Sequence, residues 1–408
     1  MTTRRDFLKS STLLGFGATV PTFLGRTARA ADPAKNKETI LVVVQLTGGN
    51  DGLNTVIPYT NPLYAKYRPT IGIPADKVFT LNKEFGLHPA LAGIGRLIND
   101  LNAGCVIQGV GYPNPDQSHF RSMDIWHAAS TAKSLNEGWL GKSLKAKPAG
   151  AFHLAAENET APLALAGAPA RVPSINSLAD FQLKFAAASG ADKASQKKLV
   201  EAVASGEAEQ PGLLDFVRRT QTDTYATTDR LQKIGKNYEP KVPYPANSFG
   251  ERLKLAAQLI DADLGTRIFY VSQENYDTHA GQGGVTGSHA NLLTTLGDGL
   301  SAFYRDLKER GHADRLCMMT FSEFGRRAKE NGSAGTDHGS GAPMFLLGGK
   351  LKAGLIGEHP DLEKLDDGNL KHTVDFRSVY AAVLDQWLGI DSKTVLGAKY
   401  DPVAAFKA

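Results

Sequence analysis

The sequence predicts an α/β protein built on a doubly wound, mostly parallel sheet. Short apolar runs rich in β-branched residues indicate strands that are covered on both faces. Amphipathic helical segments alternate with these runs, as in successive βαβ units. The length of 408 residues and the hydrophobic fraction of 42% are sufficient to bury one large core.

The first 30 residues differ from the rest and predict an export signal. The pair Arg4 and Arg5 is followed by an apolar stretch over 13–24 and then by Ala28-Arg29-Ala30. This pattern is typical of a twin-arginine signal peptide with a small-residue cleavage site. The apolar stretch is shorter than a membrane-spanning helix. We therefore expect cleavage after Ala30, no stable membrane anchor, and a periplasmic or secreted protein whose partner during export is the twin-arginine translocase.

The net charge gives no reason to expect a nucleic-acid partner. The chain has 46 basic and 42 acidic side chains, and residues 1–30 hold five of the basic ones and one of the acidic ones. The remaining 41 of each sign leave residues 31–408 formally neutral. A neutral chain lacks the overall field that attracts nucleic acid or an anionic membrane.

Residues 31–408 form a single predicted domain, which opens with a strand over 39–46 and a glycine-rich loop over 48–52. A helix follows behind Pro89, with apolar residues at helical spacing as far as Leu101. The run 105–110 is the next strand. Between about 177 and 236 the chain is charged and rich in alanine and threonine, which predicts a helical insertion.

The C-terminal half repeats the alternation, with predicted strands over 268–272, 315–321 and 344–347. A long helix carries one apolar stripe over 293–307. A last amphipathic helix covers 376–387, with Asp375 as its N-cap and Gly389 as its stop. Cys105 and Cys317 lie inside strand runs, so we expect buried thiols and no disulfide framework.

Polar side chains capable of chemistry stand next to each predicted strand. In chain order they are Asp51, Ser118, His119, Asp277, His279, Glu323, Asp337 and His338. Ligands of open α/β sheets bind beyond the carboxyl ends of the strands, so we expect these groups on one rim. Several carboxylates there would repel one another unless a cation neutralises them. Histidine and carboxylate without cysteine favour zinc, manganese or iron, and an oxygen-rich companion site would suit magnesium or calcium.

Each of these residues also has a plainer interpretation. Asp51, and the pairs 277–279 and 337–338, are also compatible with polar turns. Ser118 is either a nucleophile at a helix N-terminus or only the cap of that helix. His119 binds metal, orients Ser118 or contacts solvent. Arg121 and Arg326 are candidates for holding an anionic group.

Taken together, the motifs resemble the domain-of-unknown-function 1501 family of twin-arginine-exported bacterial proteins. The likeness rests on the signal peptide and on Leu46-Thr-Gly-Gly-Asn-Asp-Gly-Leu-Asn54, Leu87-His-Pro89, Ser118-His-Phe120, Asp277-Thr-His279, Ser322-Glu-Phe-Gly-Arg326, Asp337-His-Gly339 and Asp375-Phe-Arg-Ser378. That family is similar to the alkaline phosphatase and sulfatase superfamily, whose α/β/α sandwich carries a two-metal centre. The resemblance implies that Asp277, His279 and His338 bind one metal, that Asp51 binds the other, and that Ser118 is the nucleophile. The chain departs from the superfamily at Glu323-Phe324, where the superfamily has an Asp-His pair.

Two functions are compatible with these observations. The first is an exported, metal-dependent hydrolase of phosphate or sulfate esters, acting on a small anionic ester. The second is a non-catalytic exported binding or assembly protein that retains the hydrolase fold, since fold alone does not determine function.

Overall fold

The computed structural model describes residues 38–157, 159–178 and 238–407. The predicted signal peptide, and all but the first two residues of the predicted helical insertion, lie outside the described residues. Within them, no helix is long and apolar enough to cross a membrane.

A central sheet runs through the molecule, with strand order β11-β5-β10-β9-β1-β8-β6-β7 in the described residues and with β12 also paired to β5. The strands are β1 (Ile40–Leu46), β5 (Gly104–Gly111), β6 (Gly150–Leu154), β7 (Ser174–Ile175), β8 (Thr266–Gln273), β9 (Leu316–Phe321), β10 (Ala342–Leu347), β11 (Gly354–Ile356) and β12 (Val374–Asp375). Every pairing is parallel except those of β10, which runs antiparallel to β5 and β9. The mostly parallel sheet expected from the sequence is thus confirmed.

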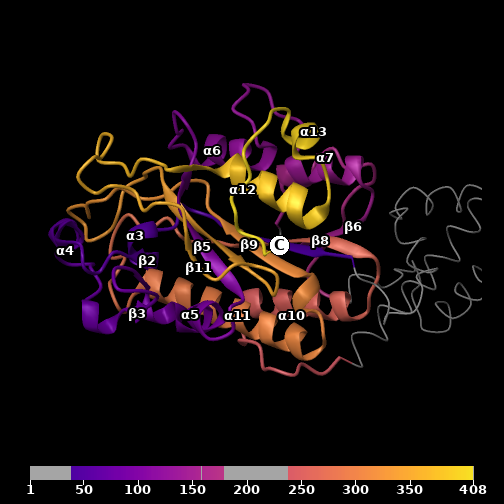
Figure 1. The fold of residues 1–408 in the computed structure, drawn as a ribbon, viewed down its shortest axis with the longest axis horizontal. Helices are drawn as coiled ribbons and strands as arrows, with labels where there is room; N and C mark the ends of the chain where they lie inside the picture. Colours follow the sequence, from indigo (N-terminus) through magenta and orange to yellow (C-terminus); the bar gives the residue numbers. More distant parts are fainter. Residues whose placement is uncertain (1–37, 158, 179–237, 408) are drawn as a thin grey trace, which may run out of the picture.

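Helices cover both faces of this sheet (Figure 1). On one face lie η3 (Pro89–Leu91), α5 (Ala92–Asn99), α10 (Ser248–Asp261), α11 (Ser288–Glu309) and the single turn η6 (Ala313–Arg315). On the other lie α6 (His119–Ala128), α7 (Trp139–Ala146), η4 (Leu163–Leu165), α12 (Phe376–Ala382), the π-helical turn η7 (Val383–Leu388) and α13 (Ser392–Leu396). Side chains of β1 alternate between the two cores, which explains why its sequence is apolar at nearly every position. The molecule is the predicted α/β/α sandwich.

A smaller sheet and several short helices pack beside the main sheet. Its strands are β2 (Val56–Ile57), β3 (Phe79–Thr80) and β4 (Gly86–Leu87), in the order β2-β4-β3. The short helices α3 (Gly52–Thr55) and α4 (Pro62–Tyr67) lie in the same region (Figure 1), and η2 (Ala75–Lys77) directly precedes β3 in the chain. This region has a small separate hydrophobic core that includes Leu53, Ile57 and Tyr64.

Within the described residues, the predicted elements agree with the structure except at one helix end and in the last helix, where the predicted helix over 376–387 is the α-helix α12 followed by the π-helical turn η7. Asp375 is the N-cap of α12, and Gly389 ends the following turn in a left-handed conformation, as expected. Cys105 and Cys317 are buried free thiols. The helix behind Pro89 ends at Asn99, and Leu101 lies beyond it at 39% exposure, so its place in the apolar stripe was predicted wrongly.

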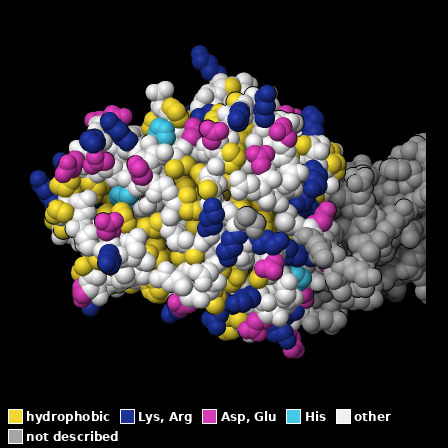
Figure 2. Space-filling model, viewed as in Figure 1, with side chains coloured by type: hydrophobic (Ala, Val, Ile, Leu, Met, Phe, Trp, Pro, Cys, Tyr) yellow, Lys and Arg dark blue, Asp and Glu magenta, His cyan; other side chains and the backbone are white. Residues whose placement is uncertain are grey.

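Both signs of charge occur on the face seen in Figure 2, among uncharged and apolar side chains.

Candidate metal centre

Several strand ends meet at one edge of the sheet. Leu46 of β1 pairs with Gln273 of β8, and Gln45 pairs with Phe321 of β9, so these three strands end at the same level. Because β10 is antiparallel, its first residue lies beside the end of β5, where Ala342 pairs with Val110. The loop before β10 therefore reaches the same edge as the loops after the parallel strands. This is how His338, which precedes its strand, joins residues that follow theirs.

Asp277, His279 and His338 come together at this edge. The Nε2 atoms of His279 and His338 lie 2.9 Å apart, and Asp277 Oδ1 is 3.1 Å from the first and 3.2 Å from the second. The structure thus brings together the trio for which the sequence predicted a shared ion.

His119 reaches the same carboxylate from the first turn of α6. Its Nε2 is 3.4 Å from Asp277 Oδ2, and the candidate ligand atoms of His119, Asp277 and His338 all lie within 4.8 Å of one another. The sequence left the role of His119 open, and the structure places it among the candidate ligands.

A protein acceptor holds the other ring nitrogen of each histidine. His119 Nδ1 is 2.8 Å from Glu323 Oε1, His279 Nδ1 is 3.3 Å from Asp337 Oδ1, and His338 Nδ1 is 2.8 Å from the carbonyl oxygen of Gln117. Metal-binding histidines nearly always donate this second N–H to a carboxylate or a carbonyl. Glu323 and Asp337, both predicted as ligands, therefore lie behind the histidines as their partners.

The hydrogen-bond roles around His338 require a cation or a proton at its Nε2. A carbonyl oxygen only accepts, so His338 Nδ1 carries the hydrogen and Nε2 of the neutral ring carries a lone pair. That lone pair faces both the Asp277 carboxylate and the His279 ring. A divalent ion relieves this repulsion, and two imidazoles with one carboxylate are a common ligand set for catalytic zinc. The residues present thus fit a metal ion.

Burial and neighbouring charges act on the ionisation of these groups. Burial raises the pKa of Asp277, but the hydrogen bond and charge of Arg326 outweigh it, and the pKa lies below its ordinary value. The hydrogen bond to Glu323 raises the pKa of His119, whereas burial lowers the pKa of His338. A carboxylate and a neutral imidazole are the forms that bind metal.

Asp51 lies in a different environment from the one predicted. It is fully buried, and its oxygens accept hydrogen bonds from Arg68 Nη1 at 2.6 Å, from Arg68 Nη2 at 3.0 Å and from Gln282 Nε2 at 2.6 Å. Glu323 is similarly engaged, since it accepts from the Gly48 amide and from Ser322 as well as from His119. The structure does not bring Asp51 to the histidine cluster.

Ser118 stands between two residues that belong to the cluster. Gln117 binds His338 through its carbonyl, and His119 contacts Asp277. Ser118 is the N-cap residue of α6, but its side chain makes no capping hydrogen bond and is exposed. The hydroxyl is therefore accessible beside the candidate ligands.

The two candidate anion-binding arginines donate hydrogen bonds mainly to backbone carbonyls instead. Arg121 Nη2 donates to the carbonyls of Thr131 and Ala132. Arg326 is buried, and its three nitrogens donate to the carbonyls of Gly48, Gly49, Tyr276 and Thr336 and to Asp277. Arg326 thus ties the glycine-rich loop to the candidate ligand Asp277.

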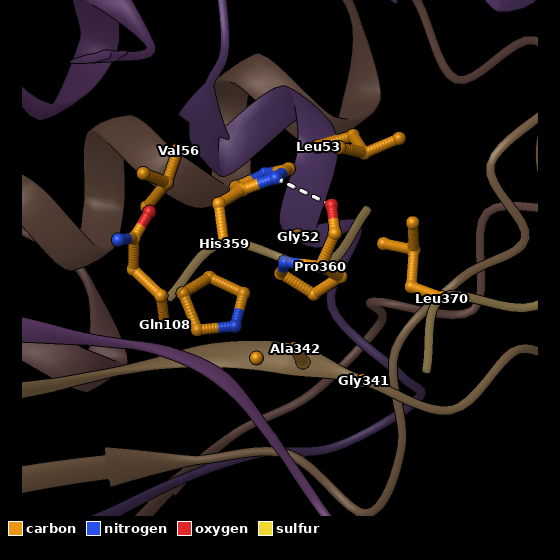
Figure 3. Close-up of a pocket in the computed structure, with 11 residues that line it drawn as sticks. Gly52, Leu53, Val56, Gln108, Gly341, Ala342, His359, Pro360 and Leu370 are labelled. Atoms are coloured by element: carbon orange, nitrogen blue, oxygen red, sulfur yellow. Dashed lines mark hydrogen bonds between the residues drawn. The ribbon is translucent and has the colours of Figure 1, made fainter. Parts of the chain in front are cut away.

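A small cavity is lined by none of the residues of this cluster. It measures about 20 Å³, and Gln108, His359, Pro360 and Leu370 are among the residues that line it (Figure 3). His359 Nδ1 lies 2.8 Å from the Pro360 carbonyl oxygen. The volume suits about one water molecule, so we assign no substrate to it.

The fold and the site together define an α/β/α protein with a histidine and carboxylate cluster at the strand-end edge of its sheet. The chain belongs to the family described as "Protein of unknown function (DUF1501)", whose model matches residues 103–400. The family membership predicted from the motifs is confirmed. No curated protein matches the sequence.

Two solved structures illustrate what the chain resembles in three dimensions. The PsFucS1 sulfatase from Pseudoalteromonas sp. is 13% identical with a TM-score of 0.39, over 94% of this chain and 74% of the sulfatase. The alkaline phosphatase from the Antarctic bacterium TAB5 is 12% identical with a TM-score of 0.30, over 78% of this chain and 95% of the phosphatase.

Proposed function

We propose that this protein is an exported, metal-dependent hydrolase of phosphate or sulfate esters. The observation that carries the proposal is the convergence of His279 Nε2, His338 Nε2 and Asp277 Oδ1 within 3.2 Å of one another. Three such protein ligands leave open positions for a water molecule or a substrate, as catalytic metal sites require.

The ion would be held by Asp277, His279 and His338, with His119 beside them. Zinc or manganese suits two imidazoles and a carboxylate. Asp51 and Glu323, the residues predicted for a second ion of the magnesium or calcium type, are both fully buried, and both oxygens of each accept from protein donors. Asp277 also accepts from Arg326, but its side chain is 44% exposed and faces the histidines. We therefore propose one ion per chain. Such an ion supplies positive charge that stabilises the oxygens of an ester undergoing substitution.

Ser118 would act as the nucleophile toward a small anionic ester. Its hydroxyl is exposed at the start of α6, a helix of 10 residues. The free N–H groups and the dipole at such a helix end favour a negatively charged group. Glu323 would hold the His119 ring in place from behind.

Export through the twin-arginine translocase to the periplasm or the medium is part of the proposal. Its support is the motif around Arg4 and Arg5, which lies outside the described residues. That route carries folded proteins, so the metal would be bound before export.

The test combines a metal analysis with an ester assay. Protein purified without chelator should contain about one zinc or manganese ion per chain and should hydrolyse aryl phosphate or aryl sulfate when that metal is present. A variant with both His279→Ala and His338→Ala should lose the metal and the activity while it remains folded by circular dichroism. The matched control is His312→Ala, because His312 lies near Asp261, apart from this cluster.

Unchanged metal content in the double variant would overturn the ligand assignment. Metal binding without turnover of either ester would favour the alternative, a binding or assembly protein that retains the fold. A specific observation favours that alternative: Phe324, buried at 1% exposure, packs its ring against both His119 and His338. The superfamily has a histidine at this position.

A further inference from the structure

We propose that Gln282 is a positioning residue for the metal centre. It holds the loop after β8, which carries Asp277 and His279, in register with the loop before β10, which carries His338. The ion pair of Asp51 and Arg68 in turn orients the Gln282 amide. The proposal rests on the metal centre proposed above. Gln282 follows His279 by three residues, yet it contributes nothing to the candidate ligand set.

The Gln282 side chain joins the two loops through its carbonyl oxygen. Oε1 accepts a hydrogen bond from Thr278 Oγ1 at 2.8 Å and another from Thr336 Oγ1 at 2.8 Å. Thr278 stands between the candidate ligands Asp277 and His279, and Thr336 stands two residues before His338. One amide oxygen is therefore hydrogen-bonded both to Thr278, which adjoins Asp277 and His279 in the chain, and to Thr336, which lies two residues before His338.

The ion pair behind Gln282 determines which way its amide faces. Asp51 only accepts when ionised, so its carboxylate selects the Nε2 side of the amide, which donates to Asp51 Oδ2 at 2.6 Å. Both terminal nitrogens of Arg68 donate hydrogen bonds to the same carboxylate. With Nε2 held there, Oε1 is left to accept from both threonines.

Burial makes these contacts rigid. Asp51, Gln282 and Thr336 are 0% exposed, and Thr278 is 6% exposed. Water cannot readily replace a lost partner at this depth, so each broken hydrogen bond leaves a buried polar group unpaired.

Backbone contacts join the same two loops along their length. The Thr336 amide donates to the Thr278 carbonyl at 3.0 Å, and the Gln282 amide donates to the Ala334 carbonyl at 2.9 Å. Asn331 Nδ2 also donates to the His279 carbonyl at 2.9 Å. Gln282 thus completes a contact between loops that are distant in sequence, and it does so directly behind the candidate ligands.

The experiment measures Co²⁺ binding to the full-length chain after removal of resident metal. In Gln282→Met, a variant of similar shape without the amide, the Co²⁺ affinity should fall about tenfold, and the visible spectrum of bound Co²⁺ should change as its geometry relaxes. Thr278→Val and Thr336→Val should each weaken binding, and Thr278→Ser and Thr336→Ser should restore it because they keep the hydroxyl. The control Ser143→Ala removes a buried hydroxyl that donates to the Leu140 carbonyl in α7, and it should leave Co²⁺ binding unchanged.

The outcomes separate the two proposals. If the original chain binds no Co²⁺, both the metal centre and the role of Gln282 are overturned. If it binds Co²⁺ and all the variants bind with the same affinity and spectrum, only the role of Gln282 is overturned. Should Gln282→Met fail to fold, the valine and serine pairs decide the question.

Discussion

At the scale of single residues, the candidate site consists of side chains that approach one another at the strand ends. The three histidines reach it from α6, from the loop after β8 and from the loop before β10. Their second ring nitrogens are held by Glu323, by Asp337 and by a backbone carbonyl. The orientation of each ring is therefore set by a contact on the side of the ring away from Asp277. Glu323 and Asp337 have the chemistry of metal ligands, but in this structure they are hydrogen-bonded to the candidate ligands His119 and His279.

Ser118 can be tested by a substitution that separates its two interpretations. Because its side chain makes no capping hydrogen bond, Ser118→Ala should change the free energy of unfolding by well under the approximately 1 kcal/mol of a true cap. Urea unfolding measures this. The same variant should retain its metal and lose ester hydrolysis if Ser118 is the nucleophile. Hydrolysis at the original rate would exclude that role and would leave His119 or a metal-bound water as the attacking group.

At the scale of the element, the direction of β10 matters more than any single side chain. An antiparallel strand enters the sheet from the edge at which its parallel neighbours end, so the loop before it lies with the loops after them. In addition, Gly48 and Gly49 precede Asp51 with φ angles of +119° and +80°. A Cβ atom at Gly48 would lie 2.4 Å from the Asp277 amide nitrogen. This loop therefore needs glycine to approach the candidate ligand so closely.

The start of α12 provides a prediction about an element. The Asp375 side chain accepts a hydrogen bond from the Arg377 amide at 2.9 Å and from Arg377 Nη2 at 2.6 Å. Asp375→Ala should therefore destabilise the protein by about 1 kcal/mol, seen as a lower urea midpoint. Asp375→Asn keeps the capping acceptor and should lose less than the alanine variant. Equal stability of the alanine variant and the original chain would show that the cap is not used.

For the whole molecule, buried histidines predict acid sensitivity. Burial lowers the pKa of His127 to about 3 and that of His289 to about 4. His127 Nε2 lies 2.8 Å from Gln45 Oε1 within the core. Burial raises the pKa of Glu159, but the neighbouring His153 ring and hydrogen bonds from the Ala156 amide and Ser272 outweigh it and hold the pKa at about 2.

All three groups destabilise the fold as the pH falls. Below about pH 6.5 each of these histidines binds a proton in the unfolded chain but stays neutral in the folded protein. Below about pH 4.5, Glu159 likewise binds a proton in the unfolded chain but stays ionised in the folded protein. The free energy of unfolding should then fall by about 1.4 kcal/mol per pH unit for each histidine down to its folded pKa. Urea midpoints between pH 7 and pH 4 measure the slope. His127→Gln should flatten it, and an unchanged slope in that variant would contradict the assignment.

The sequence alone determined the α/β fold and its central strands, and it predicted that Asp277, His279 and His338 lie together at one edge of the sheet. Apolar runs identify strands because a strand covered on both faces must be apolar throughout, a condition visible within seven or eight residues. The position of Asp277 and His279 after one such run, and of His338 before another, is equally local. For this reason the sequence pattern was sufficient to predict that Asp277, His279 and His338 lie at the same edge of the sheet.

Only the tertiary structure decided what each carboxylate does. Asp51 resembles a ligand in sequence, but its partners are Arg68 in a different loop and Gln282, which is 231 residues away. No local sequence pattern identifies Gln282 as a contact of Asp51. Nor does any local pattern predict that β10 is antiparallel or that His119 contacts Asp277. A buried carboxylate is stabilised by whichever donor the fold brings to it. Strand runs depend on neighbours in the chain, whereas ion pairs, ligand sets and strand direction depend on neighbours in space.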